Sequence, residues 1–167
     1  VTDSFKTYMI GKGVREDKIL VVKNGVDLGQ YQPLNGTNVL VEELGLHGKF
    51  VASYFGTHGM AHHLETVLQA AQKLTHAKDV VFLLVGDGAE RHRLVRMREE
   101  MGLTNVMMLD QQPKSRMREL WALSSVSLVL LKKSDLFKTV IPSKIFESLA
   151  MEKPILLGVE GESADLI

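Results

Sequence analysis

The chain has 167 residues, of which 45% are apolar, and this length and composition predict one globular domain with a substantial core. Twenty basic side chains balance twenty acidic ones without a Lys/Arg block, which excludes the charge pattern of a nucleic-acid-binding protein. The absence of cysteine excludes disulfides and thiolate metal sites and favours a reducing, cytoplasmic setting. The longest apolar runs, of about six residues, are too short to cross a bilayer.

Residues 1–36 are predicted to form a lead-in that precedes the main domain at 37–167. A short helix is expected from about Asp3 to Lys12, followed by a strand at Lys18–Val22 and a turn at Asn24-Gly25. Since the sequence opens without an initiator Met and stops in what reads as the start of a helix, we expect a piece of a longer protein.

From residue 49 the sequence alternates short apolar runs with amphipathic stretches, which predicts strands and helices in turn. Two of the apolar runs, 80–85 and 126–131, are apolar on both faces, as a parallel sheet covered on each side requires. The fold class is therefore α/β, with a Rossmann-like, doubly wound parallel sheet. The expected strands are 50–55, 80–85, 105–109, 126–131 and 154–158, and the expected helices are 62–74, 89–101, 114–123 and 143–151.

The loop after the first of these strands, from Gly56 to Gly59, is predicted to bind a phosphate. Its glycines let backbone N–H groups approach an anion at the start of the next helix, although the same pattern suits a plain strand-to-helix turn. His58, His62 and His63 suggest a metal site only weakly, because no Glu lies between the first two and no third ligand is evident.

Two further loops carry candidate ligand-binding side chains. Asp87, between two glycines, is expected to cap the following helix, with contact to a ligand hydroxyl as the alternative. Pro142 and Ser143 open a helix that places Lys144 and Glu147 on one face of its first turn. A cation beside a carboxylate would suit a diphosphate and a ribose diol, whereas a solvated salt bridge is the simpler alternative.

Taken in order, these segments resemble the C-terminal domain of retaining GT-B glycosyltransferases of family 4. The most specific match is the run from Lys18 to Asp27, which ends in Asn-Gly-Val-Asp and is followed by Tyr31-Gln-Pro33. Glu147 fits the second Glu of the family's Glu-x7-Glu pair. The sequence departs from the family where Thr57 and His62 replace an Arg and a Lys that hold the diphosphate, and where Thr139 replaces the first Glu.

The resemblance implies that this half of a GT-B enzyme binds a nucleotide sugar and that an N-terminal domain supplies the acceptor site. The pieces around the Gly56 loop and Ser143 resemble a bacterial subgroup that builds O-antigen and capsule from UDP-N-acetyl amino sugars, including N-acetyl-fucosamine transferases. In this reading Lys144 is catalytic and no metal is needed. The expected donor-binding residues are Gly56, Thr57, His58, Gly59, Asp110, Gln111, Ser143, Lys144 and Glu147.

Two other functions remain open from the sequence. One is a GT-B-shaped sugar-nucleotide epimerase, and the other is a non-catalytic nucleotide-binding module, which the missing Arg, Lys and Glu would suit. For the transferase, the resemblance implies a saccharide or lipid-linked acceptor and a cytoplasmic location, with the full-length protein at the inner face of the plasma membrane.

Overall fold

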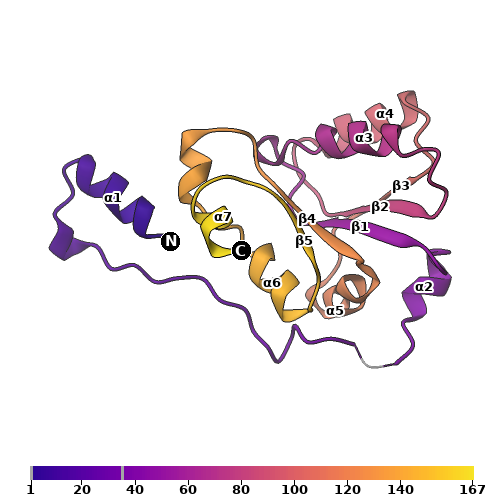
Figure 1. Cartoon of the computed structure of the whole chain (residues 1–167), viewed down its shortest axis with the longest axis horizontal. Helices are drawn as coiled ribbons and strands as arrows, with labels where there is room; N and C mark the ends of the chain where they lie inside the picture. Colours follow the sequence, from indigo (N-terminus) through magenta and orange to yellow (C-terminus); the bar gives the residue numbers. More distant parts are fainter. Residues whose placement is uncertain (1, 35) are drawn as a thin grey trace.

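The structure, a computed structural model, describes residues 2–34 and 36–167 and contains a five-stranded parallel sheet. The strands stand in the order β3-β2-β1-β4-β5 (Figure 1). Their register places the last residues of neighbouring strands side by side, as Phe55 opposite Val85 and Val85 opposite Leu109. The strand bounds are β1 Phe50–Phe55, β2 Val80–Val85, β3 Val106–Leu109, β4 Val126–Leu130 and β5 Ile155–Gly158.

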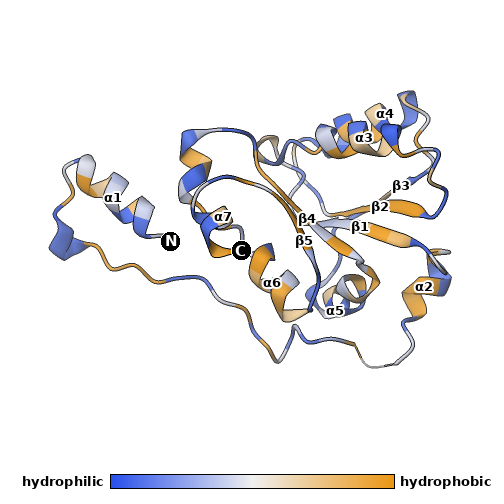
Figure 2. Cartoon of the chain, in the orientation of Figure 1, coloured by the Kyte–Doolittle hydropathy of each residue, from blue (hydrophilic) through white to orange (hydrophobic). Residues whose placement is uncertain are grey.

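Helices cover both faces of this sheet, which confirms the doubly wound α/β fold. In Figure 1, α3 and α4 lie on one side of the strands and α2 and α5 on the other, while Figure 2 shows the apolar strands between them. The bounds of the helices after residue 36 are α2 Val39–Glu43, α3 Glu65–Lys73, α4 Arg91–Glu100, α5 Lys114–Leu123, α6 Lys144–Ala150 and α7 Glu162–Leu166.

Alternate strand residues feed two separate cores, because successive side chains point to opposite faces of a sheet. Tyr54 and Leu84 pack with α3 and α4, whereas their neighbours Phe55 and Val85 pack with α2 and α5. In the second core the rings of Phe55 and Trp121 meet edge to face, with their centroids 4.7 Å apart. The sheet is thus held from both sides, and its strand ends are fixed.

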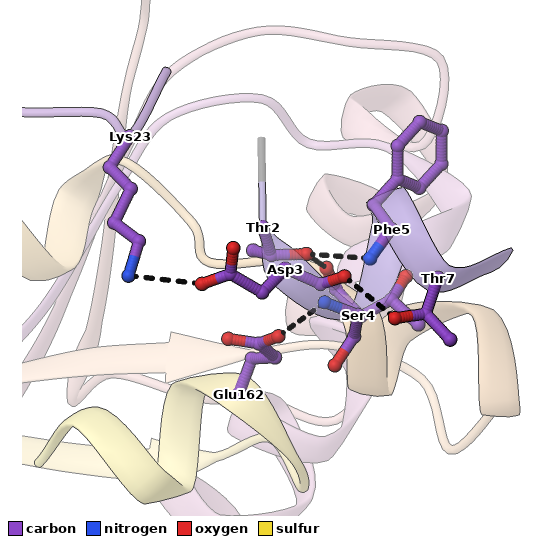
Figure 3. Close-up of polar contacts among 8 residues, drawn as sticks. Thr2, Asp3, Ser4, Phe5, Thr7, Lys23 and Glu162 are labelled. Atoms are coloured by element: carbon purple, nitrogen blue, oxygen red, sulfur yellow. Dashed lines mark hydrogen bonds and ion pairs between the residues drawn. The ribbon is translucent and has the colours of Figure 1, made fainter. Parts of the chain in front are cut away.

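The N-terminal helix α1, Asp3–Gly11, docks against the C-terminal part of the chain, as Figure 3 shows. Glu162 of α7 accepts a hydrogen bond from the backbone N–H of Ser4, at 2.8 Å, and Thr2 donates its hydroxyl to the carbonyl of Thr139. The Glu162 carboxylate at the N-terminal end of α1 also complements the dipole of that helix. The two ends of the chain are therefore tied together.

The strand predicted at 18–22 is wrong. A single 3₁₀ turn, Glu16–Lys18, is followed by an extended segment that belongs to no sheet of the described residues, with Leu20 85% and Val22 66% exposed. Strands need a hydrogen-bonding neighbour, and the edges of the sheet, β3 and β5, pair with other strands only on their inner sides. The β-favouring composition of this segment therefore does not make it a strand of the described sheet.

Three other details differ from the sequence-based expectations. Helix α2 was not expected, and α3 begins three residues later than predicted, because a 3₁₀ turn at Met60–His62 and a left-handed His63 precede it. A further 3₁₀ turn, Asp135–Thr139, follows β4. Among the described residues, no helix has the length and apolar character that crossing a membrane would require.

Candidate functional site

A cavity of about 430 Å³, here called the strand-end cavity, opens at the carboxyl ends of β1, β2 and β3 and is closed on another side by the start of α6. The chain winds from β1 through β2 to β3 in one direction and then crosses to β4 on the other side of β1. Ligands of open parallel sheets bind at such a reversal of strand order, beyond the strand ends. The cavity therefore lies where this topology predicts a binding site.

Two backbone loops join to form the floor of the cavity. The N–H of Gly56 donates to the carbonyl of Val85 at 3.0 Å, and the N–H of His58 donates to that of Asp87 at 2.8 Å. A Cβ on Gly86 would lie 1.9 Å from the carbonyl oxygen of Gly56, so glycine is required there. The close contact of these loops places the ends of β1 and β2 side by side beneath any ligand.

This pairing corrects the predicted anion cradle at 56–59. Two of its four backbone N–H groups are already bonded to protein, so Thr57 and Gly59 carry the only amides of the loop without a backbone partner in the described chain. The loop also does not open directly onto α3, which begins only at Glu65. The loop by itself therefore offers less positive charge to a phosphate than the sequence suggested.

Asp87 does not cap the following helix, contrary to prediction. The N-cap of α4 is Glu90, which makes no side-chain cap hydrogen bond, whereas Asp87 accepts from the N–H of Gly88 at 2.7 Å. This hydrogen bond keeps the Asp87 carboxylate within the loop, three residues before the N-cap Glu90. Asp87 instead lines the strand-end cavity, as its alternative reading required.

Lys144, in the first turn of α6, is a buried cation at the edge of the cavity. Its residue is 8% exposed, and its Nζ has no hydrogen-bond partner within residues 2–34 and 36–167. Nζ lies 3.5 Å from the centroid of the Tyr54 ring, a cation–π contact. Burial lowers the pKa of Lys144 to about 7, while the Glu147 carboxylate acts in the opposite direction. The solvated salt bridge considered above is therefore wrong, because this amine is withdrawn from water.

Glu147 lines the same cavity one helical turn further on and is half-buried. Burial raises the pKa of its carboxyl, and the indole of Trp121 and the charges of Lys144 and Lys114 oppose that rise. A carboxylate acceptor and a buried ammonium thus face one space, as the spacing in α6 predicted.

The three histidines after β1 have different surroundings. His58 is fully buried, with neither ring nitrogen hydrogen-bonded to described atoms, and burial, followed by the charges of Arg91 and Lys144, lowers its pKa to about 4. His62 lines the cavity with its ring 5.9 Å from that of Tyr54. His63 faces Glu65 at 3.3 Å on the surface. The described residues contain no cluster of three or more His, Asp or Glu side chains placed to hold a metal.

Comparison with known proteins decides the family. The model of glycosyl transferases group 1 matches residues 41–167. The chain belongs to this family of group 1 glycosyl transferases.

Individual relatives agree with that membership. A putative colanic acid biosynthesis glycosyl transferase, WcaI of Escherichia coli K12, is 27% identical over 154 residues, which are 90% of this chain and 37% of WcaI. Anabaena HepE, solved in complex with UDP-glucose, superposes with a TM-score of 0.83 at 20% identity, over 99% of this chain and 45% of HepE. WaaG, involved in lipopolysaccharide biosynthesis, gives 0.81 at 14% identity, over 100% of this chain and 45% of WaaG. The chain thus spans less than half the length of these proteins, and the two structures establish that it has the fold of a GT-B half.

Six of the residues predicted for the donor site of this group 1 domain line the strand-end cavity. They come from the loop after β1, the loop after β3 and the start of α6: Gly56, Thr57, Gln111, Ser143, Lys144 and Glu147. The structure therefore brings six of the nine predicted residues to one cavity, and their role in donor binding stays a prediction.

Three predicted residues do not line this cavity. His58 is packed beneath the floor, Gly59 lies beyond it as the N-cap of the 3₁₀ turn, and Asp110 is exposed and pairs with Arg91. Asp110 turns away because Arg91, anchored by a hydrogen bond from its Nε to the carbonyl of Gly86, attracts the carboxylate. The neighbouring Gln111 takes the inner position.

Sequence reasoning missed several lining residues, among them Tyr31, Gln112, Lys114 and Met117. Lys114 and Met117 lie in the first turn of α5, directly after β3, so the strand-end rule could have found them. Tyr31 had been noted only as part of the linker signature. Its place in the cavity depends on how the lead-in folds back, for which the sequence contains no local signal.

Proposed function

We propose that this chain is the donor-binding domain of a retaining GT-B glycosyltransferase and that the strand-end cavity holds the diphosphate and ribose of a nucleotide sugar. The single observation that carries the proposal is the buried amine of Lys144, which has no hydrogen-bond partner among the described residues. A buried charge without a partner is costly and calls for an anion. The cavity that Lys144 lines offers space for that anion, with Glu147 one turn away.

In the proposed reaction, this domain stabilises the leaving group, which is the nucleoside diphosphate. As the bond between the anomeric carbon and the diphosphate breaks, negative charge grows on the diphosphate oxygens. The protonated Lys144 donates to those oxygens, helped by the amide of Thr57, and charge placed in advance is effective for this purpose. Glu147 accepts hydrogen bonds from the ribose hydroxyls. The acceptor and any general base belong to a second domain.

The donor that we propose is a UDP-N-acetyl amino sugar, transferred to a saccharide or lipid-linked acceptor in bacterial cell-surface polysaccharide synthesis at the cytoplasmic side of the plasma membrane. The choice of UDP is supported by HepE, whose structure contains UDP-glucose. The amino sugar rests on the resemblance of the Gly56 and Ser143 segments to N-acetyl-fucosamine-type transferases. Gln111, which lines the cavity from the loop after β3, is the residue that we propose to border the base.

Calorimetric titration of the chain with UDP, GDP and UDP-N-acetylglucosamine, with and without magnesium, tests this function. The expected result is UDP binding that does not depend on magnesium and is lost in Glu147→Ala. Glu65→Ala is a matched control, since Glu65 is a carboxylate in the first turn of α3, outside the cavity. Failure of all three nucleotides to bind the wild-type chain would contradict the proposal.

A second candidate, a nucleotide-binding module without turnover, is favoured by one observation. Thr139, which stands where the family has the first Glu of its pair, does not line the strand-end cavity, and its hydroxyl donates to the carbonyl of Leu136. A turnover assay of the full-length protein with UDP-sugars separates the two. Donor binding without transfer or hydrolysis would favour the module.

A further inference from the structure

Residues 27–33, here called the strap, form a compact turn that passes over one side of the strand-end cavity. Asp27 organises this turn, because its carboxylate accepts from the N–H of Gly29 at 2.8 Å and its carbonyl accepts from the N–H of Tyr31 at 2.9 Å. Such an Asp-led turn is a stable local structure. Tyr31 therefore has a defined position at the end of the turn.

Hydrogen bonds join the strap to helix α5. Arg118 donates from Nε to the carbonyl of Gln32 and from Nη2 to the carbonyl of Pro33, both at 2.9 Å. Gln30 adds a bond from its Nε2 to the carbonyl of Lys114 at 3.3 Å. The strap is thus attached to the helix whose first turn also lines the cavity.

Tyr31 is the residue of the strap that lines the strand-end cavity. Its half-buried ring packs against the second core and lines the cavity together with Met117 and Glu147. Burial raises the pKa of Tyr31, and the negative charge of Glu147 raises it further. The phenol therefore stays protonated, so that it can donate a hydrogen bond within the cavity that Tyr31 and Glu147 both line.

We propose that Tyr31 is a nucleoside-contacting residue whose ring covers the ribose end of the cavity and whose hydroxyl donates a hydrogen bond to a ribose oxygen beside Glu147. The inference rests on the proposed function and adds a specificity-determining residue to it. Glu147 can only accept hydrogen bonds when ionised, whereas ribose hydroxyls both donate and accept. Tyr31 supplies the missing donor, so the pair discriminates a ribonucleotide from a ligand that carries only phosphates.

Paired titrations of UDP and inorganic pyrophosphate test this role. Tyr31→Phe keeps the ring and removes the hydroxyl, so we expect about a fivefold loss of UDP affinity, the size of one neutral hydrogen bond, and unchanged pyrophosphate affinity. Tyr31→Ala should weaken UDP binding further. Tyr8→Phe is the matched control, because Tyr8 lies on α1 and does not line the cavity.

A variant outside the cavity tests the strap as a positioning element. Arg118→Ala removes both bonds to the strap without touching the cavity lining, and it should reduce UDP affinity as much as Tyr31→Ala while leaving pyrophosphate affinity unchanged. Arg118→Lys, which can restore one bond, should recover part of the loss. Wild-type and Tyr31→Phe chains that bind UDP equally well would overturn the role of Tyr31 alone, whereas a wild-type chain that binds no UDP would overturn the proposed function as well.

Discussion

The amine of Lys144 lies over the ring of Tyr54, 3.5 Å from its centroid, and Gly56 leaves the space beside it open, since a Cβ there would lie 3.2 Å from Nζ. The ring offers the cation a weak electrostatic partner but no hydrogen bond. The three N–H donors of the ammonium therefore remain available for a ligand. Their burial without hydrogen bonds lowers the free energy of unfolding of the domain.

Replacing Lys144 should have opposite effects on the stability of the chain and on its affinity for UDP. Lys144→Met keeps the length of the side chain and removes the buried charge, so we expect a melting temperature that is equal to or higher than that of the wild type. UDP affinity should fall about 10- to 100-fold, as expected for loss of a charge-assisted hydrogen bond. Differential scanning fluorimetry and calorimetry measure the two effects.

Lys73→Met serves as the control, because Lys73 is exposed on α3 and should change neither quantity. Equal UDP affinities of the Lys144→Met and wild-type chains would contradict the assignment of Lys144 to the diphosphate.

Stability should rise with pH above neutrality. The pKa of Lys144 is about 7 in the folded chain against a usual value of 10.5, so the unfolded chain binds more protons between these values. The buried charge of Lys144 destabilises the folded chain fully below about pH 7, and this effect disappears as the pH approaches 10.5. Between these values the free energy of unfolding should rise by up to about 1.4 kcal/mol per pH unit. The difference in unfolding free energy between the wild type and Lys144→Met, measured in urea across this range, should show that slope. A difference that does not change with pH would contradict the buried cation.

The contact between the two floor loops should tolerate no side chain at residue 86. Gly86→Ala places a Cβ 1.9 Å from the carbonyl oxygen of Gly56, so the loops must separate. We expect the free energy of unfolding to fall by about 3 kcal/mol and UDP binding to be lost. Gly102→Ala is the matched control: it also has a positive φ, of 62°, but nothing lies within 4 Å of its Cβ, and it should cost only about 1 kcal/mol. Similar losses in both variants, measured by urea unfolding, would show that the floor loops are not tightly packed.

Trp121 should be the most costly side chain to truncate in the second core. It is fully buried, and its ring meets that of Phe55 edge to face. We expect Trp121→Ala to lose about 3–5 kcal/mol and Trp121→Phe to lose clearly less, because the aromatic contact is retained. Circular dichroism during urea unfolding provides the measurement, since Trp121 is the single tryptophan of the chain. A loss below about 1 kcal/mol in Trp121→Ala would contradict this packing.

The sequence predicted the sheet well and the lead-in poorly, for a physical reason. Strands such as Val80–Val85 are apolar on both faces, and this pattern records their burial directly. The segment at 18–22 has an equally apolar pattern, but a strand also needs a neighbour, which local sequence does not encode. Lys144 and Glu147 could be placed together because helical spacing brings them to one face. Tyr31 could not be placed, since more than 80 residues separate it from the helix that holds its strap.

The attachment of the strap also says where natural variation should be tolerated. Arg118 binds carbonyl oxygens, which every residue possesses, so the side chains of Gln32 and Pro33 contribute nothing specific to those two bonds. Drift at positions 32 and 33 should therefore leave the wall of the cavity in place, whereas drift at position 118 should not. The selective constraint on this wall is thus exerted far along the chain from the residues that form it.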